Sequence, residues 1–210
     1  MKKLFIALPL LAAVPLLAQG GPLKPGTMDP ARVTAGSYKT DPNHTLVGWR
    51  VDHLGFSDYF GIFGDVTGTL VLDPKNPAAA KVDITIPVSK VTTASAGLTA
   101  HLLRAGKDGG KPDFFGPAPL DAHFVSTGVA VSGAEAKITG NLTLNGVTRP
   151  VTLDAHFTGA GKAPFPGAKE TVGFAAKTTL KRSEFGVNYG IPLVSDEVQL
   201  DITVAFEKTA

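Results

Sequence analysis

Hydrophobic and polar residues alternate along most of the chain from Ser37 onward. In the segment KVDITIPV, for example, Val82, Ile84 and Ile86 share one face, and Asp83 lies on the other. The same alternation is found near residues 45–53, 64–73, 81–88, 122–131, 136–146, 150–157, 171–181 and 197–207. Strands with one apolar and one polar face belong to antiparallel sheets that are wet on one side. The pattern therefore predicts about eight antiparallel strands.

Two local signals indicate how these strands are connected. Asn145-Gly146 separates two alternating segments and predicts a tight hairpin. Between residues 94 and 106, Leu98 and Leu102 recur at helical spacing, which predicts one short helix. A single helix inserted in a run of strands fits a closed barrel with a lid. Closure removes the exposed sheet edges, and a barrel of about eight strands can enclose one small ligand.

The N-terminal segment does not follow this pattern. Residues 1–20 combine two lysines, an apolar run and a final Ala-Gln-Gly, which is typical of a cleaved secretory signal peptide. A transmembrane helix fits less well, because the run is shorter than about 20 residues and contains prolines. Residues 21–36 contain three Pro and three Gly without periodicity and predict a linker. We therefore expect a barrel domain over residues 37–210 and no transmembrane anchor.

Composition narrows the class of protein further. The chain has 210 residues, of which 43% are hydrophobic and 18% charged, and it has no Cys. It is therefore globular, without disulfides or thiolate chemistry. The chain has 20 basic and 18 acidic residues, and removal of Lys2 and Lys3 with the signal peptide would leave 18 of each. Because no Lys/Arg cluster is present either, we expect no binding to nucleic acid.

The sequence lacks the motifs of the common catalytic and metal sites. Its five His residues do not have metal-ligand spacing, no GxSxG motif occurs, and the Gly-rich segment at residues 106–111 lacks the Walker spacing. We predict no catalytic residue, no metal ligand and no cofactor.

One segment is unusually rich in aromatic residues and glycines, namely WRVDHLGFSDYFGIF, which begins at Trp49. Trp49, Val51 and His53 alternate on one face, so His53 follows two apolar neighbours inward. His53 is either a core histidine bonded to the backbone or a polar group at the mouth of a pocket. The aromatic residues here and at Phe114-Phe115 either fill the core or form the rim or lid of an apolar cavity. The pattern alone leaves both alternatives open.

Several short motifs occur in order along the chain. They include WRVDHLG at residues 49–55, DFF at 113–115, LTLNGVTRPV at 142–151 and RSEFG at 182–186. Each is weak alone, but the ordered set resembles the YceI-like family of lipid- or polyisoprenoid-binding proteins. The resemblance implies an extended, lipocalin-like antiparallel barrel with a long apolar internal tunnel. It also implies export, usually to the periplasm, and no established catalytic step.

The chain departs from the family pattern on the predicted lid. Thr99-Ala100 replaces an Arg-Asp pair, and the linker from Leu103 to Pro112 is longer and richer in Gly than usual. These departures concern the identity of the ligand more than the fold.

Together, the pattern and the resemblance predict a periplasmic or secreted protein, not an enzyme, that sequesters or carries a polyisoprenoid, an isoprenoid quinone or another long-chain lipid. A lipid-modifying enzyme and an envelope stress protein with a protein partner are the alternatives, and a homodimer is left open. The predicted ligand-binding residues are Trp49, Val51, His53, Phe60, Phe63, Leu98, Leu102, Phe114, Phe115, Phe124, Leu142, Phe174 and Phe185.

Overall fold

The computed structural model describes residues 24–209, which form mostly antiparallel strands. The strands are β1 (Gly36–Thr40), β2 (Leu46–His53), β3 (Ser57–Phe63), β4 (Thr67–Leu72), β5 (Lys81–Ile86), β6 (Val91–Thr93), β7 (Ala122–Ser132), β8 (Glu135–Leu144), β9 (Val147–Lys162), β10 (Glu170–Lys181) and β11 (Glu197–Lys208). The described residues also form one α-helix, α1 (Ala96–Leu103), and short 3-10 helices η1 (Pro30–Arg32), η2 (Pro77–Ala79), η3 (Val88–Lys90), η4 (Lys107–Gly109) and η5 (Arg182–Phe185). The predicted signal peptide lies outside the described residues.

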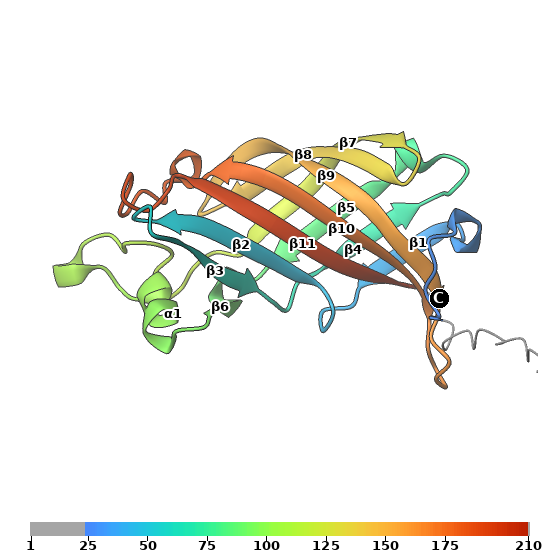
Figure 1. Ribbon diagram of the computed structural model, residues 1–210, viewed down its shortest axis with the longest axis horizontal. Helices are drawn as coiled ribbons and strands as arrows, with labels where there is room; N and C mark the ends of the chain where they lie inside the picture. Colours follow the sequence, from blue (N-terminus) through green and yellow to red (C-terminus); the bar gives the residue numbers. More distant parts are fainter. Residues whose placement is uncertain (1–23, 210) are drawn as a thin grey trace, which may run out of the picture.

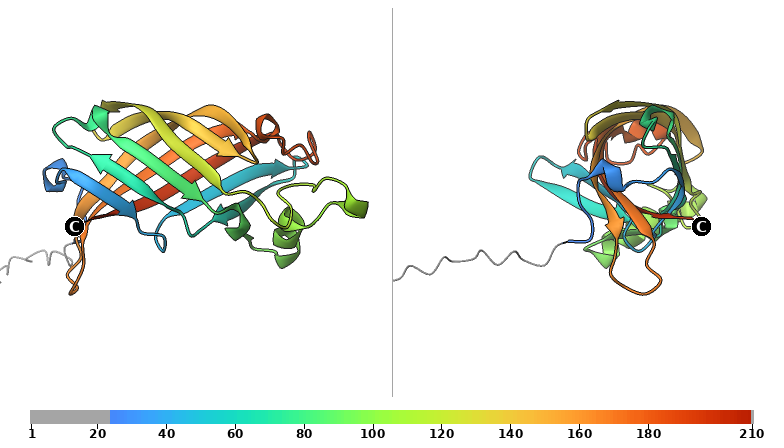
Figure 2. Two further views of the ribbon diagram at one scale, coloured as in Figure 1. Left: turned by 180° about the vertical axis from the view of Figure 1, so that it is seen from behind. Right: turned by 90° about the vertical axis from the view of Figure 1, so that its right-hand side faces the viewer.

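Eight of the strands close into a barrel. Their order is β1-β4-β5-β7-β8-β9-β10-β11, and β11 pairs again with β1. The ring is visible end-on in the right-hand view of Figure 2, and its long axis runs horizontally in Figure 1. The predicted eight-stranded antiparallel barrel with one short helix is therefore confirmed.

Three further strands extend the wall at one end. β11 pairs with β1 through its last residues and with β2 through residues 199–203, and β3 and β6 follow β2 in the sheet. The predicted strand at 45–53 corresponds to β2 and lies in this extension. The closed ring instead uses β1, which the alternation did not reveal.

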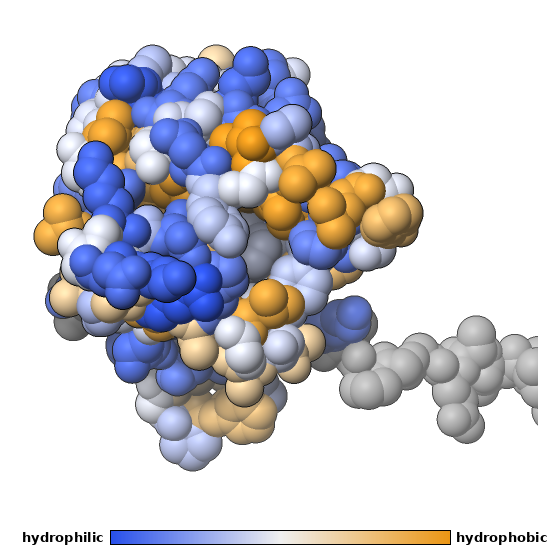
Figure 3. Space-filling model, turned by 90° about the vertical axis from the view of Figure 1, so that its left-hand side faces the viewer, coloured by the Kyte–Doolittle hydropathy of each residue, from blue (hydrophilic) through white to orange (hydrophobic). Residues whose placement is uncertain are grey.

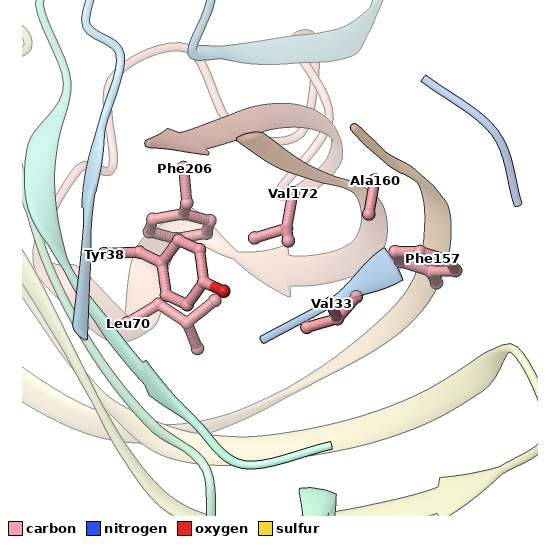
Figure 4. Close-up of a cluster of buried hydrophobic side chains, with 7 residues drawn as sticks. All are labelled: Val33, Tyr38, Leu70, Phe157, Ala160, Val172 and Phe206. Atoms are coloured by element: carbon pink, nitrogen blue, oxygen red, sulfur yellow. The ribbon is translucent and has the colours of Figure 1, made fainter. Parts of the chain in front are cut away.

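A cluster of buried side chains lies at the narrow end of the barrel (Figure 4). Tyr38 and Val172 are fully buried, and Leu70 and Phe206 pack beside the ring of Tyr38. Val33 also joins this cluster, although it lies in the segment predicted to be a linker. Residues further upstream pair with the barrel as well, since the amide of Thr27 donates to the carbonyl of Ala160 at 3.1 Å. The described part of the predicted linker thus packs against the barrel.

The predicted hairpin at Asn145-Gly146 joins β8 to β9. Asn145 has φ 52° and Gly146 has φ 77°, so both residues have left-handed backbone conformations. A two-residue turn of this kind matches the twist of the flanking strands, and Asn-Gly is the sequence that adopts it most readily.

A half-buried carboxylate, that of Glu170, fastens the start of β1 and the residues before it to β10. Glu170 accepts hydrogen bonds from the amide of Thr34 at 2.9 Å, the Thr34 hydroxyl at 2.7 Å and the Tyr38 hydroxyl at 2.8 Å. Burial tends to raise the pKa of Glu170, but these hydrogen bonds and the nearby charge of Lys208 outweigh it and hold the pKa below its usual value. The network therefore stabilises the ionised form.

The depressed pKa of Glu170 predicts a loss of stability in acid. A carboxyl with a lowered folded-state pKa contributes stability above its unfolded pKa, about 4.3 for Glu, and loses it as the pH falls through the folded value. We expect Glu170→Gln to lower the free energy of unfolding by on the order of 1 kcal/mol at about pH 7 and to have little effect at about pH 3. Urea unfolding at both pH values measures this. Glu207→Gln, which removes a more exposed carboxylate paired with Lys169, is the control. Equal losses at both pH values for Glu170→Gln would contradict the prediction.

Candidate functional site

The wide end of the barrel contains a cavity of about 510 Å³ with almost entirely apolar walls. Strands β2, β3, β8 and β11 line its sides, and α1 and the segments around Phe114 and Tyr189 cover it. In Figure 1 this is the left-hand end, where α1, the β2–β3 turn and the loop before β11 come together. The volume is within the range of about 300–1,000 Å³ that is usual for small-molecule sites.

The β2–β3 hairpin forms one wall of the cavity. Trp49, Val51 and His53 line it from β2, as their alternation predicted, and Phe63 and Tyr59 line it from β3. Sequence reasoning had missed Tyr59 as a site residue.

Gly61 on β3 makes room for the indole of Trp49. A Cβ atom at Gly61 would lie 2.1 Å from Cζ2 of Trp49, so no larger residue fits there. The aromatic residues and glycines of this segment thus have complementary roles, because the glycine lets the large ring lie across the neighbouring strand.

Phe60 was predicted as a ligand-binding residue, but it lines neither cavity. Phe60 is 57% exposed on the outer face of β3, and the guanidinium of Arg50 lies 5.2 Å from its ring centroid. The register pairs Trp49 with Gly61 and Arg50 with Phe60, so period two places Phe60 on the opposite face from Trp49.

Three buried side-chain polar atoms of this hairpin have no hydrogen-bond partner, and two of them belong to residues that line the cavity. The indole nitrogen of Trp49 and the hydroxyl of Tyr59 are buried and unpaired, and the two ring centroids lie 6.4 Å apart. Most buried polar atoms are paired, so an unpaired one requires an explanation. Both groups are hydrogen-bond donors of residues that line the cavity.

A lid built on α1 covers the cavity. The helix begins after Ser95, whose hydroxyl accepts from the amide of Leu98, and it contributes Leu98, His101 and Leu102 to the cavity wall. The predicted helix is therefore present. The amide of Phe115 donates to the carbonyl of Leu102 at 3.0 Å, which fastens the segment after the helix back onto it.

Asp113 holds the lid together. Its carboxylate accepts from Arg104 at 2.6 Å and pairs with Nε2 of His101 at 2.7 Å. The hydrogen bond from Arg104 and, to a smaller extent, that from His101 hold the pKa of Asp113 below its usual value. The ring of Phe114 lies 5.2 Å from His101 and 5.3 Å from Tyr189, measured between centroids. The lid therefore contacts the loop that precedes β11.

Arg182 organises that loop. Its guanidinium donates four hydrogen bonds to main-chain carbonyls, through Nε to Ser195, through one terminal nitrogen to Val187 and Tyr189, and through the other to Val194, at 2.8–2.9 Å. The residue is only 6% exposed and lines the cavity. It was recognised as part of a motif, but not as a site residue.

The loop also meets the tip of the β2–β3 hairpin. The amide of Leu54 donates to the carbonyl of Leu193 at 2.8 Å, and Phe56 at the tip is exposed. Figure 3 looks onto this end and shows apolar side chains, in orange, gathered among polar ones. The entrance region therefore has an apolar character on its outside as well.

A second cavity of about 270 Å³ continues toward the narrow end. Phe124 and Phe174 line it, and Leu142 lines both cavities. Phe185 lines neither cavity; it is 1% exposed and belongs to the buried cluster that also contains Phe124 and Leu142. The prediction of Phe185 as a ligand-binding residue is therefore not supported by its position.

Within the described residues, no group of three or more His, Asp or Glu side chains is placed to hold a metal ion. His123 pairs with Asp83 at 2.7 Å and His156 with Glu135 at 3.0 Å. Both pairs are partly exposed, and the second borders the smaller cavity. None of the helices in residues 24–209 has the length and apolar character needed to cross a membrane. The chemistry offered by the site is therefore burial of apolar surface, with a few polar groups near the lid.

Comparisons with known proteins agree with this architecture. The family model described as YceI-like domain matches residues 38–206. Protein YceI of Salmonella arizonae is 41% identical over 173 residues, which cover 81% of this chain and 86% of that protein. Protein YceI of Salmonella heidelberg matches to the same extent.

Solved structures show the same fold. Burkholderia cenocepacia BcnA superposes with a TM-score of 0.66 at 25% identity, covering 79% of this chain and 98% of that one. A Campylobacter jejuni YCEI protein has a TM-score of 0.62 at 27% identity, covering 90% and 100%. A polyisoprenoid binding domain from Saccharophagus degradans has a TM-score of 0.58, covering 82% and 98%; at 12% identity it is a likeness of fold alone.

Proposed function

The chain belongs to the YceI-like family, and from this premise we propose that it is an exported protein that binds and carries a long apolar lipid, such as a polyisoprenoid or an isoprenoid quinone, inside its barrel. The observation that carries the proposal is the pair of adjoining apolar cavities beneath a lid. The protein acts in the periplasm or is secreted, in keeping with the N-terminal sequence.

Apolar burial supplies the affinity in this proposal. Each buried CH₂ contributes about 0.8 kcal/mol, so even a chain of modest length gains several kcal/mol in these cavities. Ordering of the chain and loss of its overall freedom offset part of that gain. The cavities offer no comparable set of polar partners, so a ligand without a long apolar portion gains little.

The polar end of the ligand lies near the lid in this proposal. His53 is the last residue of β2, at the wide end of the barrel. Its main chain forms an isolated antiparallel β-bridge with Val194, which lies in the loop that Arg182 holds. The unpaired donors of Trp49 and Tyr59 lie deeper in the same wall. These groups suit oxygen atoms close to the start of an apolar chain.

Trp49 provides a direct test. It is the only Trp in the chain and lines the first cavity, so its fluorescence reports on that cavity alone. We expect a long-chain isoprenoid alcohol to shift and change its emission with saturation, because the chain replaces water or empty space beside the indole. The Trp49→Phe variant, in which the signal is absent, controls for inner-filter effects. An unchanged spectrum, together with no bound alcohol by native mass spectrometry, would refute the proposal.

Native mass spectrometry also identifies the natural ligand. Protein purified without detergent from the envelope fraction of its own source is expected to carry an apolar adduct that is lost on extraction with organic solvent. The mass of the extracted compound then distinguishes a polyprenyl alcohol from a quinone.

A further inference from the structure

The two cavities meet at a ring of four aliphatic side chains. Val47, Ile86, Leu142 and Leu200 each line both cavities, and no other residue within 24–209 does so. Val47 and Leu142 are only 6% and 8% exposed. We call these four side chains the waist.

The waist narrows the barrel from three sides. Ile86 comes from β5, Leu142 from β8 and Leu200 from β11, with Val47 of β2 beside Leu200. In the closed ring, β7 separates β5 from β8, β9 and β10 separate β8 from β11, and β1 and β4 separate β11 from β5. The side chains therefore converge on the axis from well-separated positions rather than forming a patch on one wall.

The two chambers have different capacities. The first, beneath the lid, has about 510 Å³ and fits the usual range for a complete small-molecule site. The second has about 270 Å³ and lies below that range, and Leu70, Phe157 and Phe206 of the buried cluster line part of it. The second chamber therefore suits the end of a chain whose first part already fills the first chamber.

We propose that the waist sets the chain-length preference of this protein: short isoprenoids occupy the first chamber alone, and long ones bind by passing between Val47, Ile86, Leu142 and Leu200 into the second. This inference rests on the proposed function and adds the residues that select ligand length. Each CH₂ that reaches the second chamber gains the same burial energy as one in the first, so long chains gain affinity only if the waist lets them through.

The test narrows the waist with Leu142→Phe and compares a short alcohol, farnesol, with a long one, solanesol. We expect Leu142→Phe to leave farnesol affinity near the wild-type value and to lower solanesol affinity by about tenfold or more, the equivalent of losing two or more buried CH₂ groups. Affinities are measured by native mass spectrometry or by titration of Trp49 fluorescence.

The matched control is Leu144→Phe. Leu144 lies two positions further along the same strand, on the same face, and lines the first cavity only. The same change in side-chain volume is expected to alter the affinities of both alcohols by a similar factor. A selective loss of solanesol in Leu142→Phe, but not in Leu144→Phe, locates the length selection at the waist.

Other outcomes distinguish a failure of the waist proposal from a failure of the proposed carrier function. If wild-type protein binds both alcohols and Leu142→Phe keeps the wild-type ratio of affinities, the waist proposal is wrong and the carrier function stands. If wild-type protein binds neither alcohol, the carrier function itself fails. Should Leu142→Phe not fold, as judged by circular dichroism, Leu142→Ala tests the same idea in the opposite direction. Widening the waist should then raise the solanesol-to-farnesol affinity ratio, and an unchanged ratio would overturn the proposal.

Discussion

Arg182→Ala is expected to lower the free energy of unfolding by about 3–5 kcal/mol. The guanidinium is buried and holds the carbonyls of Val187, Tyr189, Val194 and Ser195 in one network. Truncation leaves four main-chain acceptors without these donors, one in a buried and three in partly buried hydrogen bonds, and each acceptor that stays away from water costs about 1–3 kcal/mol. The loop from Val187 to Ser195 can open to hydrate some of them, so the expected loss is smaller than the sum of four such costs.

Urea unfolding followed by circular dichroism measures this loss. Arg182→Lys keeps the charge but not the fork of five donors, so it should restore only part of the stability. Arg149→Ala is the matched control, because Arg149 is exposed and donates only to the carbonyl of its neighbour Thr148, and its loss should stay within about 0.5 kcal/mol. If Arg182→Ala were no more destabilising than Arg149→Ala, the loop would be held by other contacts.

The position of Arg182 also links stability to the site. Asp196 accepts from the Ser183 amide at 2.8 Å and from its hydroxyl at 2.7 Å, which fastens the start of η5 to the end of the same loop. Arg182 and Asp196 together therefore shape the loop that carries Tyr189 against the lid. A substitution that destabilises this loop should therefore also destabilise the closed state of the lid.

The strands were predictable because alternation is a local property. A strand with one face in the barrel and one in water repeats with period two, and β5 and β7 to β11 show it over enough residues to be recognised. β1 was missed because it has five residues and its one large apolar side chain is Tyr38. Its strand character comes from pairing with β4 on one side and β11 on the other. That information depends on tertiary contacts and not on local pattern.

The cavity-lining residues could be predicted from the sequence only where the inward face of their strand could be recognised. Trp49, Val51 and His53 are alternate residues of one strand, so the sequence placed all three on the same face. Phe60 was assigned to the inward face because the alternation of β2 was not extended across the hairpin to its partner residues in β3. Extending it from Trp49 to its partner Gly61 would have identified Tyr59 as inward and Phe60 as outward. Arg182 could not be found in this way, because its partners are carbonyls of an irregular loop.

Replacing both Phe114 and Phe115 by alanine should speed the release of bound lipid by about tenfold or more, corresponding to about 1.4 kcal/mol or more. Phe114 contacts His101 and Tyr189, and Phe115 lies 6.1 Å from Phe63 between ring centroids, so the pair joins the lid to both the loop and the cavity wall. Without these contacts, α1 is still attached to β6 by the hydrogen bonds between Thr93 and Thr99, and to residues 113–115 by those of Asp113 and the Leu102 carbonyl. Changes to contacts of this kind act chiefly on the rate of dissociation.

Release is measured by transfer of a fluorescent isoprenoid from loaded protein to an excess of acceptor vesicles, with circular dichroism to confirm folding. Phe165→Ala is the control for loss of an aromatic side chain, since Phe165 is exposed and lies in the β9–β10 turn. The single variants separate two roles. Phe114→Ala should speed release with little loss of stability, because Phe114 contacts the lid and the loop before β11. Phe115→Ala should also destabilise the fold, because Phe115 packs against the buried cluster of Phe124 and Leu142. A folded double variant with wild-type release would show that the lid does not limit exit, and that the chain leaves by another route.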